Sequence, residues 1–519
     1  MADAPVKPAP AAEASTGMRR EILVVLPGLL LAIMLAMLDQ LIVGTALPRI
    51  VGDLGGVAHL SWVVTAYVLA STITTPLYGK LGDMYGRKKL FMTAIVIFLA
   101  GSALAGLSQS MAMLITFRAI QGLGAGGLMV SAIAIIGDLV SPRERGQYMG
   151  YIMAVMMIAT IGGPLLGGWI TESFSWRWIF YINLPIGGVA LAYLAATLKL
   201  PRKHVKHRVD YLGAAVLAVA ATAIVLAATW GGTQYAWLSP QIAGLGVVSV
   251  LSVVAFIWIE SRAAEPILPL HIFRSRNFSL VSALSFLSGL ALFGAITFLP
   301  LYQQTVQGAS PTVSGLLLTP MMVGVMITSL ISGQVTTRTG RYRALPILGA
   351  GGMTAGMWLL SLLGVNTSRV TSALFMVVLG LGMGFPMQLT TLLAQNSVEP
   401  RDIGVASSSR LFFQQIGGSL GVAAFGAIFA RRLQDALTAV SPNVHISTSG
   451  GQLNPATVKA LPPAIQHDVF YAIAHAIQGV FIWAIPACAL AFGLTWFLKE
   501  VPLRGRAPAD EPAAPELVG

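Results

Sequence analysis

The chain has 519 residues, of which 55% are hydrophobic and 10% are charged, and its mean hydropathy is +0.77. Soluble domains carry about 25% charged residues, so this composition excludes a soluble globular protein and indicates an all-α polytopic membrane protein. The apolar runs are continuous rather than alternating, which excludes a transmembrane β-barrel. The net charge of +12 is better explained by basic cytoplasmic loops than by nucleic acid as a partner.

The amino-terminal end combines a polar tail with a spanning run that contains an acid. Residues 1–21 are rich in Ala and Pro and predict a disordered cytoplasmic tail. The apolar run at 22–47 is long enough to cross a bilayer, and it contains Asp39. We place Asp39 well inside a span, and all other acids in loops, in tails or at helix ends. A carboxylate at membrane depth is costly and marks a functional site by default; the alternative is a packing ion pair with an arginine.

Fourteen apolar windows are long enough to be spans, and an even number places both termini on one side of the membrane. They lie near 22–47, 60–79, 89–108, 111–137, 146–170, 178–198, 211–230, 240–260, 279–303, 313–333, 345–364, 371–394, 404–430 and 470–498. Most of the 32 Lys and Arg fall in loops on the same side as the N-terminus. Positive charge accumulates on the cytoplasmic side, so we expect both termini in the cytoplasm.

An internal repeat indicates how the spans are grouped. The loop Gly79–Lys89 follows the second span and recurs after the tenth as Gly333–Arg343, with the same spacing between its first glycine and its Gly-Arg pair. Such repeats are typical of secondary transporters built from two six-helix bundles. The predicted division is an N-terminal bundle at 22–200, two inserted helices at 201–265, a C-terminal bundle at 266–500 with an irregular outer loop at 431–469, and a cytoplasmic tail at 501–519.

Four residues of the first loop are candidates for a gate. Gly79 permits close approach of helices, and Gly86 suits a left-handed turn. Asp83 can sit at a helix N-terminus or pair with Arg87. The alternative is a basic cytoplasmic loop with turn glycines and no further role.

A second intramembrane charge lies in the fourth span. Arg118 must be paired or face water at that depth. Asp39 is the candidate partner, either directly or through water and Gln121. We therefore predict that Asp39, Arg118 and Gln121 form one polar site.

The fifth span contains a dense run of small and helix-bending residues, with Gly163, Pro164 and Gly167 as gating candidates. Proline removes a backbone hydrogen bond, and glycines allow tight contact between helices. The run indicates a bent helix that seals one side of a central cavity, or plain close packing. The Trp- and Arg-containing segment 175–185 suits interfacial anchoring as well as function.

Flexible methionines, aromatic rings and amide side chains suit substrates of varied shape. The candidate substrate contacts are Met153, Met156, Met157, Phe293, Phe298, Tyr302, Gln303, Arg410, Phe412, Phe413 and Gln414. Arg410 is a further intramembrane cation, in the thirteenth span. It either pairs with a carbonyl group or lipid headgroup, or helps to bind an anionic or zwitterionic substrate.

Taken in order, these motifs resemble the major facilitator superfamily, specifically its fourteen-span drug/proton antiporter family. The resemblance covers about residues 22–500 and rests on the Asp39 motif, the loop 79–89, Arg118 with its neighbours, the Gly-Pro run and the segment 176–185. It implies a major facilitator fold of two six-helix bundles plus two inserted helices.

The resemblance also implies roles: proton coupling for Asp39 and Arg118, a cytoplasmic gate for Asp83 and Arg87, and antiport for the Gly-Pro helix. The chain departs from the family pattern at Leu41 and Gly44, where Thr and Asn are frequent. It also lacks acids within predicted spans nine to fourteen, which argues against divalent cations as substrates.

We therefore expect a proton-coupled antiporter that exports amphipathic drugs or other lipophilic organic compounds by alternating access. The alternative is an exporter of an endogenous lipid or metabolite, with drug efflux incidental. The expected partners are a small amphipathic substrate, protons and membrane lipid. We expect a monomer in the bacterial cytoplasmic membrane, driven by the proton gradient without a cofactor or metal. The sequence has no Walker loop, paired carboxylates or metal-spaced histidines, which argues against an enzyme.

Overall fold

In the computed structural model, residues 10–54, 60–140, 144–198, 210–232, 234–263, 265–440 and 463–502 are described. All regular elements in these ranges are helices. The first half comprises α1 (Pro10–Leu54), α2 (Leu60–Tyr85), α3 (Arg87–Gly106), α4 (Met111–Leu139), α5 (Arg145–Ser173), α6 (Trp178–Tyr181) and α7 (Asn183–Thr197). Two further helices follow, α8 (Tyr211–Trp230) and α9 (Pro240–Glu260).

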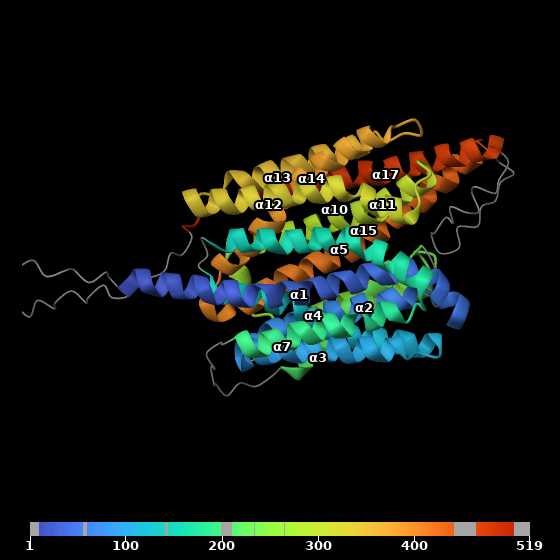
Figure 1. The fold of residues 1–519 in the computed structure, drawn as a ribbon. Coiled ribbons are helices and arrows are strands. Elements are labelled where there is room, and N and C mark those ends of the chain that lie inside the picture. The colour runs from blue at the N-terminus through green and yellow to red at the C-terminus, as the bar shows by residue number, and fades with distance from the viewer. Residues whose placement is uncertain are drawn as a thin grey trace, which may run out of the picture.

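The second half begins with a short 3₁₀ helix and has a comparable series of long helices. Its elements are η2 (Leu270–Arg274), α10 (Arg276–Thr305), α11 (Pro311–Leu317), α12 (Thr319–Thr339), α13 (Ala344–Leu360), α14 (Arg369–Asn396), η3 (Pro400–Asp402), α15 (Ile403–Val440) and α17 (Pro463–Thr495). The long helices run roughly parallel to one another in Figure 1.

Within the described residues, twelve helical segments are long and apolar enough to cross a membrane. The chain is thus an all-helical integral membrane protein, as its composition predicts. The shorter apolar helix α13 and the helix α2 are not among the twelve. Every predicted span coincides with a helix or a pair of helices, whereas the count of fourteen spans stays a prediction.

Two predicted irregular segments are partly helical. The expected disordered tail at 1–21 overlaps α1, which begins at Pro10, because its Ala-rich sequence favours a helix. The expected irregular loop at 431–469 is shorter than predicted, since α15 continues to Val440 and α17 begins at Pro463. Residues 441–462 of that loop and 503–519 of the predicted tail lie outside the described residues.

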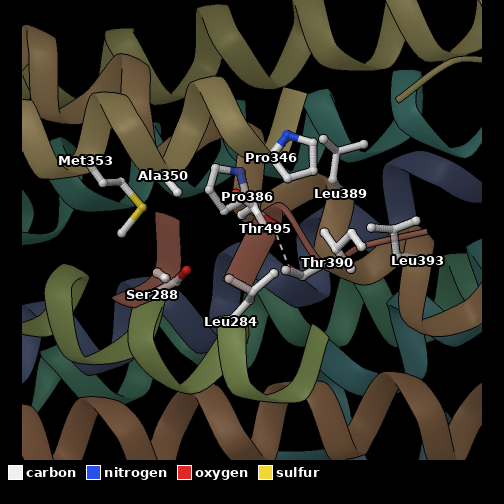
Figure 2. Close-up of a pocket in the computed structure, with 12 residues that line it drawn as sticks. Leu284, Ser288, Pro346, Ala350, Met353, Pro386, Leu389, Thr390, Leu393 and Thr495 are labelled. Atoms are coloured by element: carbon white, nitrogen blue, oxygen red, sulfur yellow. Dashed lines mark hydrogen bonds between the residues drawn. The ribbon is translucent and has the colours of Figure 1, made fainter. Parts of the chain in front are cut away.

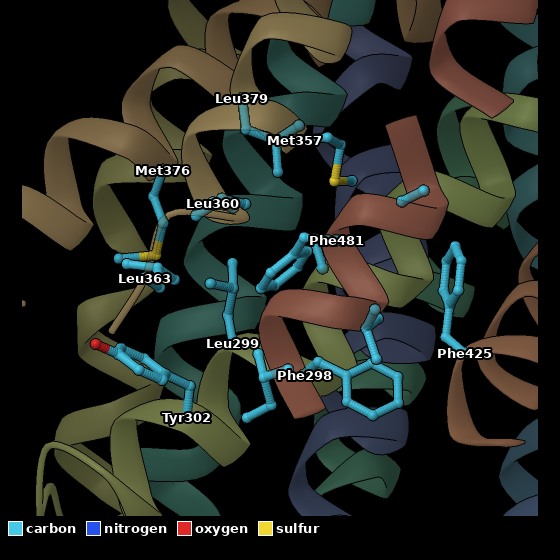
Figure 3. Packing of buried hydrophobic residues seen from close by; sticks show 14 of the residues in the cluster. Phe298, Leu299, Tyr302, Met357, Leu360, Leu363, Met376, Leu379, Phe425 and Phe481 are labelled. Carbon is cyan, nitrogen blue, oxygen red and sulfur yellow. The ribbon is translucent and has the colours of Figure 1, made fainter. Parts of the chain in front are cut away.

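The two halves each bury their own apolar core. Helices α1–α7 surround two clusters, one around Phe91 and Phe98 and one around Leu38 and Ile42. Figure 3 shows the core of the second half, in which Phe298 of α10 packs near Phe481 of α17. Burial of such side chains contributes roughly 1.5–3 kcal/mol each in water; in a membrane, close packing has the larger part.

The halves meet along an interface that we call the seam, where α2 packs against α15 and α5 packs against α12. The half-buried Met153 and Met156 of α5 contact the cores of both halves. Helices α8 and α9 pack on each other, and α8 also lies against α2 and α15. The inserted pair therefore covers one side of the seam.

The turn of the repeat has a glycine with positive φ in both halves. Gly86 joins α2 to α3 with φ of 94°, and Gly340 caps α12 with φ of 69°. Positive φ is accessible to glycine without strain, which explains why both repeats need glycine here. We call the end of the molecule that carries these two turns the hairpin end.

Candidate functional site

The predicted polar site forms, and Asp39 is its centre. The Asp39 side chain in α1 is fully buried. Its Oδ2 accepts a hydrogen bond from Arg118 Nη1 at 2.5 Å, and its Oδ1 accepts from Gln121 Nε2 at 2.8 Å. Arg118 Nη1 also donates to Gln121 Oε1 at 2.7 Å. Arg118 and Gln121 are three residues apart on α4, so both face the same neighbour.

The guanidinium of Arg118 has further partners that fix its orientation. Its Nε donates to the carbonyl oxygen of Val63 at 3.3 Å, and its Cζ lies 4.1 Å from the ring centre of Tyr67. Both residues belong to α2, which links the charge to a third helix. A cation over an aromatic face gains about 2 kcal/mol when the pair is desolvated.

Two residues of the site escaped the sequence analysis. Asn183, the first residue of α7, donates from Nδ2 to Asp39 Oδ1 at 2.7 Å and to Ser102 Oγ at 2.9 Å. Ser102 of α3 donates in turn to the carbonyl oxygen of Phe180 at 2.9 Å. The sequence signal was an amide side chain near the start of an apolar run, which by itself does not identify its partner helix.

The small residues of α5 lie directly against the helix that carries the acid. A Cβ added to Gly163 would lie 2.7 Å from Leu41 Cβ, and one added to Gly162 would lie 4.0 Å from a methyl of Leu38. Gly167 is also buried, whereas the Pro164 side chain lies outside the described residues. The helix continues through the run from Arg145 to Ser173. The glycines therefore set the distance between α5 and α1 beside Asp39.

Of the gating candidates in the loop 79–89, Gly79 and Asp83 contact α15 in the seam. Arg87 pairs with Asp83 at 2.8 Å and with Asp138 of α4 at 2.6 Å. The Asp83 carboxylate also accepts a hydrogen bond from Val405 N at 3.1 Å. It therefore sits at the N-terminus of α15, where the helix dipole favours negative charge.

Burial raises the pKa of the Asp83 carboxyl to about 6, although Arg87 and the Val405 N–H group act in the opposite direction. Gly79 lies one helical turn before Asp83 and packs on the same partner helix. A Cβ added to Gly79 would lie 2.7 Å from the carbonyl oxygen of Gly404. Only glycine permits α2 and α15 to approach so closely.

A second contact closes the seam at the same end. Arg145, at the start of α5, donates from Nη1 to Gln395 Oε1 of α14 at 2.9 Å. Gln395 Nε2 then donates to Ser407 Oγ of α15 at 2.9 Å. Arg145 also donates to the carbonyl oxygens of Val140 and Gly137. Side chains of both halves therefore meet at the hairpin end.

The candidate substrate contacts do not form one group. Met153, Met156 and Met157 lie beside the seam, as a substrate pathway between the halves would require. Tyr302 is instead buried within the second half (Figure 3), where its hydroxyl donates to the carbonyl oxygen of Gly364 at 2.8 Å. Phe298 lies in the same core.

The other aromatic and amide candidates also pack within the second half. Gln303 is buried near Met376, at 3.7 Å from its sulfur. Phe293 packs against that core and Gly418, whereas Phe412 contacts Phe413. We therefore find most of these aromatic and amide candidates packed against their own half.

Arg410 and Gln414 form a separate polar group on α15. Arg410 Nη2 donates to Gln414 Oε1 at 2.8 Å, and Nη1 donates to Thr390 Oγ1 of α14 at 3.2 Å. Nη1 also lies 3.4 Å from the carbonyl oxygen of Met387. Both side chains are buried. The carbonyl pairing expected for Arg410 is thus present, and within the described residues Arg410 has no hydrogen bond to an acid.

Thr390 also lines a cavity inside the second half, between α10, α13, α14 and α17. Figure 2 shows Pro346, Pro386 and Leu389 around it, with Thr390 donating to the carbonyl oxygen of Pro386 at 2.7 Å. Proline at this position of α14 removes a backbone donor. Most of the lining side chains are apolar.

Comparison with known proteins finds a matching family model and similar proteins that cover most of the chain. The model of the Major Facilitator Superfamily matches residues 29–422. The multidrug transporter protein MdtP of Bacillus subtilis (strain 168) is 36% identical over 510 residues, which cover 93% of this chain and 94% of that protein. Multidrug resistance protein 3 of the same organism is 37% identical over 496 residues, covering 94% and 97% of the two chains.

Among solved structures, the proton:xylose symporter XylE matches with a TM-score of 0.62 over 93% of this chain and 98% of that chain. The sequence identity is 14%, so this likeness concerns the fold.

Proposed function

The chain belongs to the Major Facilitator Superfamily, and we propose that it is a proton-coupled antiporter that exports amphipathic organic compounds. Family and relatives make it a secondary transporter rather than an enzyme. Two relatives that match over nearly their whole length are named for multidrug transport or resistance. We place it among the fourteen-span drug/proton antiporters, in the bacterial cytoplasmic membrane, with its hairpin end and both termini in the cytoplasm.

The observation that carries the proposal is the buried group formed by Asp39, Arg118, Gln121 and Asn183. An ionised carboxylate accepts all the hydrogen bonds that Asp39 receives, whereas a protonated one must donate from one oxygen. These donors come from α4 and α7, while the acid is on α1. Helix movement that separates Arg118 from Asp39 would leave the buried carboxylate without its counter-charge.

Alternating access would require two conformations that differ in how Asp39 is paired. A bound proton shifts a conformational equilibrium only when the two states bind it with different affinity. We propose that Asp39 takes up a proton from the outside and releases it into the cytoplasm, and that this proton transfer drives the export of substrate. The seam contacts of Asp83 and Arg145 would close the cytoplasmic side during part of the cycle. The glycines of α5 would transmit movement to α1.

The test is gradient-driven efflux of fluorescent lipophilic cations from proteoliposomes, measured for the wild type and Asp39→Asn. We expect the wild type to respond to an imposed pH gradient and the variant to lose that response. Asp39→Glu keeps an ionisable group and should retain part of it. Asp53→Asn is the matched control, because Asp53 accepts a hydrogen bond from Trp176 Nε1 at 2.7 Å but lies outside the spans.

Full gradient-driven efflux by Asp39→Asn would refute the coupling role of this residue. Dye movement that is independent of any ion gradient would indicate a channel rather than an antiporter. Size-exclusion profiles of all variants are needed as well, because removal of one partner from a buried ion pair destabilises proteins by about 3–5 kcal/mol.

A further inference from the structure

The second half of the molecule contains a buried positive charge whose partners, among the described residues, are carbonyl, amide and hydroxyl oxygens. Arg410 is 5% exposed. Its two terminal nitrogens donate to Thr390, Met387 and Gln414. Its Nε is buried and has no hydrogen-bond partner within the described residues.

The acids on the elements near Arg410 bond to other groups; Asp83, at the N-terminus of α15, pairs with Arg87. Between Glu265 and Glu399 the sequence contains no Asp or Glu at all. Asp402 lies 3.1 Å from His271 Nε2, at the end of the bundle. Asp39, inside the other bundle, bonds to Arg118. Arginine does not release its proton in proteins, and an ion without a counter-charge costs several kcal/mol when it is buried.

Arg410 lies one helical turn from the seam. Ser407 of α15 belongs to the contact that links Gln395 to Arg145 of the first half. Leu411, the next residue after Arg410, packs against the core of the first half. Separation of Arg145 from Gln395 would therefore open a path from the hairpin end to Arg410. Under the proposed orientation, this is the side from which an exported compound enters.

We propose that Arg410 binds the anionic group of a transported compound, so that the substrates include amphiphiles with one carboxylate, sulfonate or phosphate group. Nε and Nη2 form one edge of the guanidinium, which matches the two oxygens of such a group. Nε is free, and the anion would replace the amide oxygen of Gln414 on Nη2. This inference rests on the proposed function, because it names a substrate class for the same transporter.

The experiment compares three probes of one shape and different charge: pyrenebutyrate, pyrenebutanol and pyrenebutylamine. Equilibrium binding to the full chain in nanodiscs is measured by energy transfer from tryptophan to pyrene. A charge-assisted hydrogen bond contributes about 1.5–3 kcal/mol, so we expect the wild type to bind the carboxylate at least about tenfold more tightly than the alcohol. Arg410→Gln should bind the acid and the alcohol with equal affinity.

Arg410→Lys keeps the charge but not the planar fork, and should keep a reduced preference for the acid. If Arg410→Gln does not fold, the same binding measurement on Gln414→Leu tests the proposal. Removal of the competing amide should strengthen the preference for the acid over the alcohol. A preference that is absent in the wild type, retained by Arg410→Gln or weakened by Gln414→Leu overturns the proposal.

The readout separates this inference from the proposed function, because it measures binding rather than pumping. Acid-selective binding through Arg410 in a chain without gradient-driven efflux would refute only the antiporter. Gradient-driven efflux of the amine by a chain without acid preference would refute only the anion site.

Discussion

Replacing Gly79 with alanine should force open the seam at the hairpin end. The new Cβ would lie 2.7 Å from the carbonyl oxygen of Gly404 and 2.5 Å from Ser408 Cβ. A backbone carbonyl within a helix cannot rotate away, so α2 and α15 must separate. Overpacking of this kind costs about 1–3 kcal/mol, and the cost falls only on the conformation in which the two helices touch. The ratio of open to closed molecules should therefore rise about 5- to 150-fold.

The chain is convenient for measuring that ratio, because it contains a single cysteine, Cys488, which is buried. In a Cys488→Ala background, Ser407→Cys places a thiol behind the contact between Arg145 and Gln395. Its labelling by a hydrophilic maleimide reports the open population as long as closing is faster than labelling. We expect Gly79→Ala to accelerate labelling by the factor given above.

Gly82→Ala is the matched control on the same helix. Its added Cβ would have Arg87 Cγ as nearest neighbour at 3.7 Å, which is an ordinary contact. Alanine also favours a helix over glycine by about 1 kcal/mol, so a general effect of helix propensity would appear in both variants. Equal labelling rates in Gly79→Ala and the parent, or equal acceleration by both substitutions, would refute the assigned role of the α2–α15 contact.

Two further predictions concern the polar site and the gate. Asn183→Leu removes one hydrogen-bond donor to Asp39, worth about 1.5–3 kcal/mol for a charged acceptor, so gradient-driven efflux should fall. The control is Asn277→Leu, which removes a buried amide bonded to Lys499 and should leave coupling unchanged. Equal losses of efflux in the two variants would contradict the prediction. The closed conformation raises the pKa of Asp83 to about 6, above the value of about 4 for a solvated carboxyl, so it binds protons more tightly and gains stability as the pH falls from 7 to 5. Labelling of Ser407→Cys, normalised to a free peptide thiol, should slow over that range and lose this pH dependence in Asp83→Asn; the opposite slope would refute the reasoning.

The sequence predicted the charged centre of the site because its chemistry leaves few solutions. A carboxylate and a guanidinium buried in different spans need partners, and each is the best partner for the other. Gln121 followed from its position on the same helix face as Arg118. Asn183 was missed, since a polar residue near the start of a span can face lipid, a neighbour or a loop, and only the three-dimensional arrangement of α1 and α7 decides.

Other predictions failed or stayed open for related reasons. Tyr302 and Phe298 were expected near a substrate but lie in the core of the second half, because hydropathy does not tell which face of an all-apolar helix points to the cavity. The span start at residue 22 was predicted correctly, but the tail before it was expected to be disordered, whereas its Ala-rich sequence extends α1 back to Pro10. The contact of Asp83 with Val405 joins residues more than 300 positions apart and leaves no local pattern.

The segment that leaves the inserted helices touches both halves of the molecule. Lys80 of α2 pairs with Glu265 at 2.8 Å, and His271 Nε2 lies 3.1 Å from Asp402 Oδ2 of η3. A chain extends at most about 3.6 Å per residue, so the six steps from Glu265 to His271 span no more than about 22 Å. While both contacts hold, this segment connects the two halves and limits the distance between its two ends. Its length, rather than the strength of any contact, would then limit how far the two halves can separate on that side.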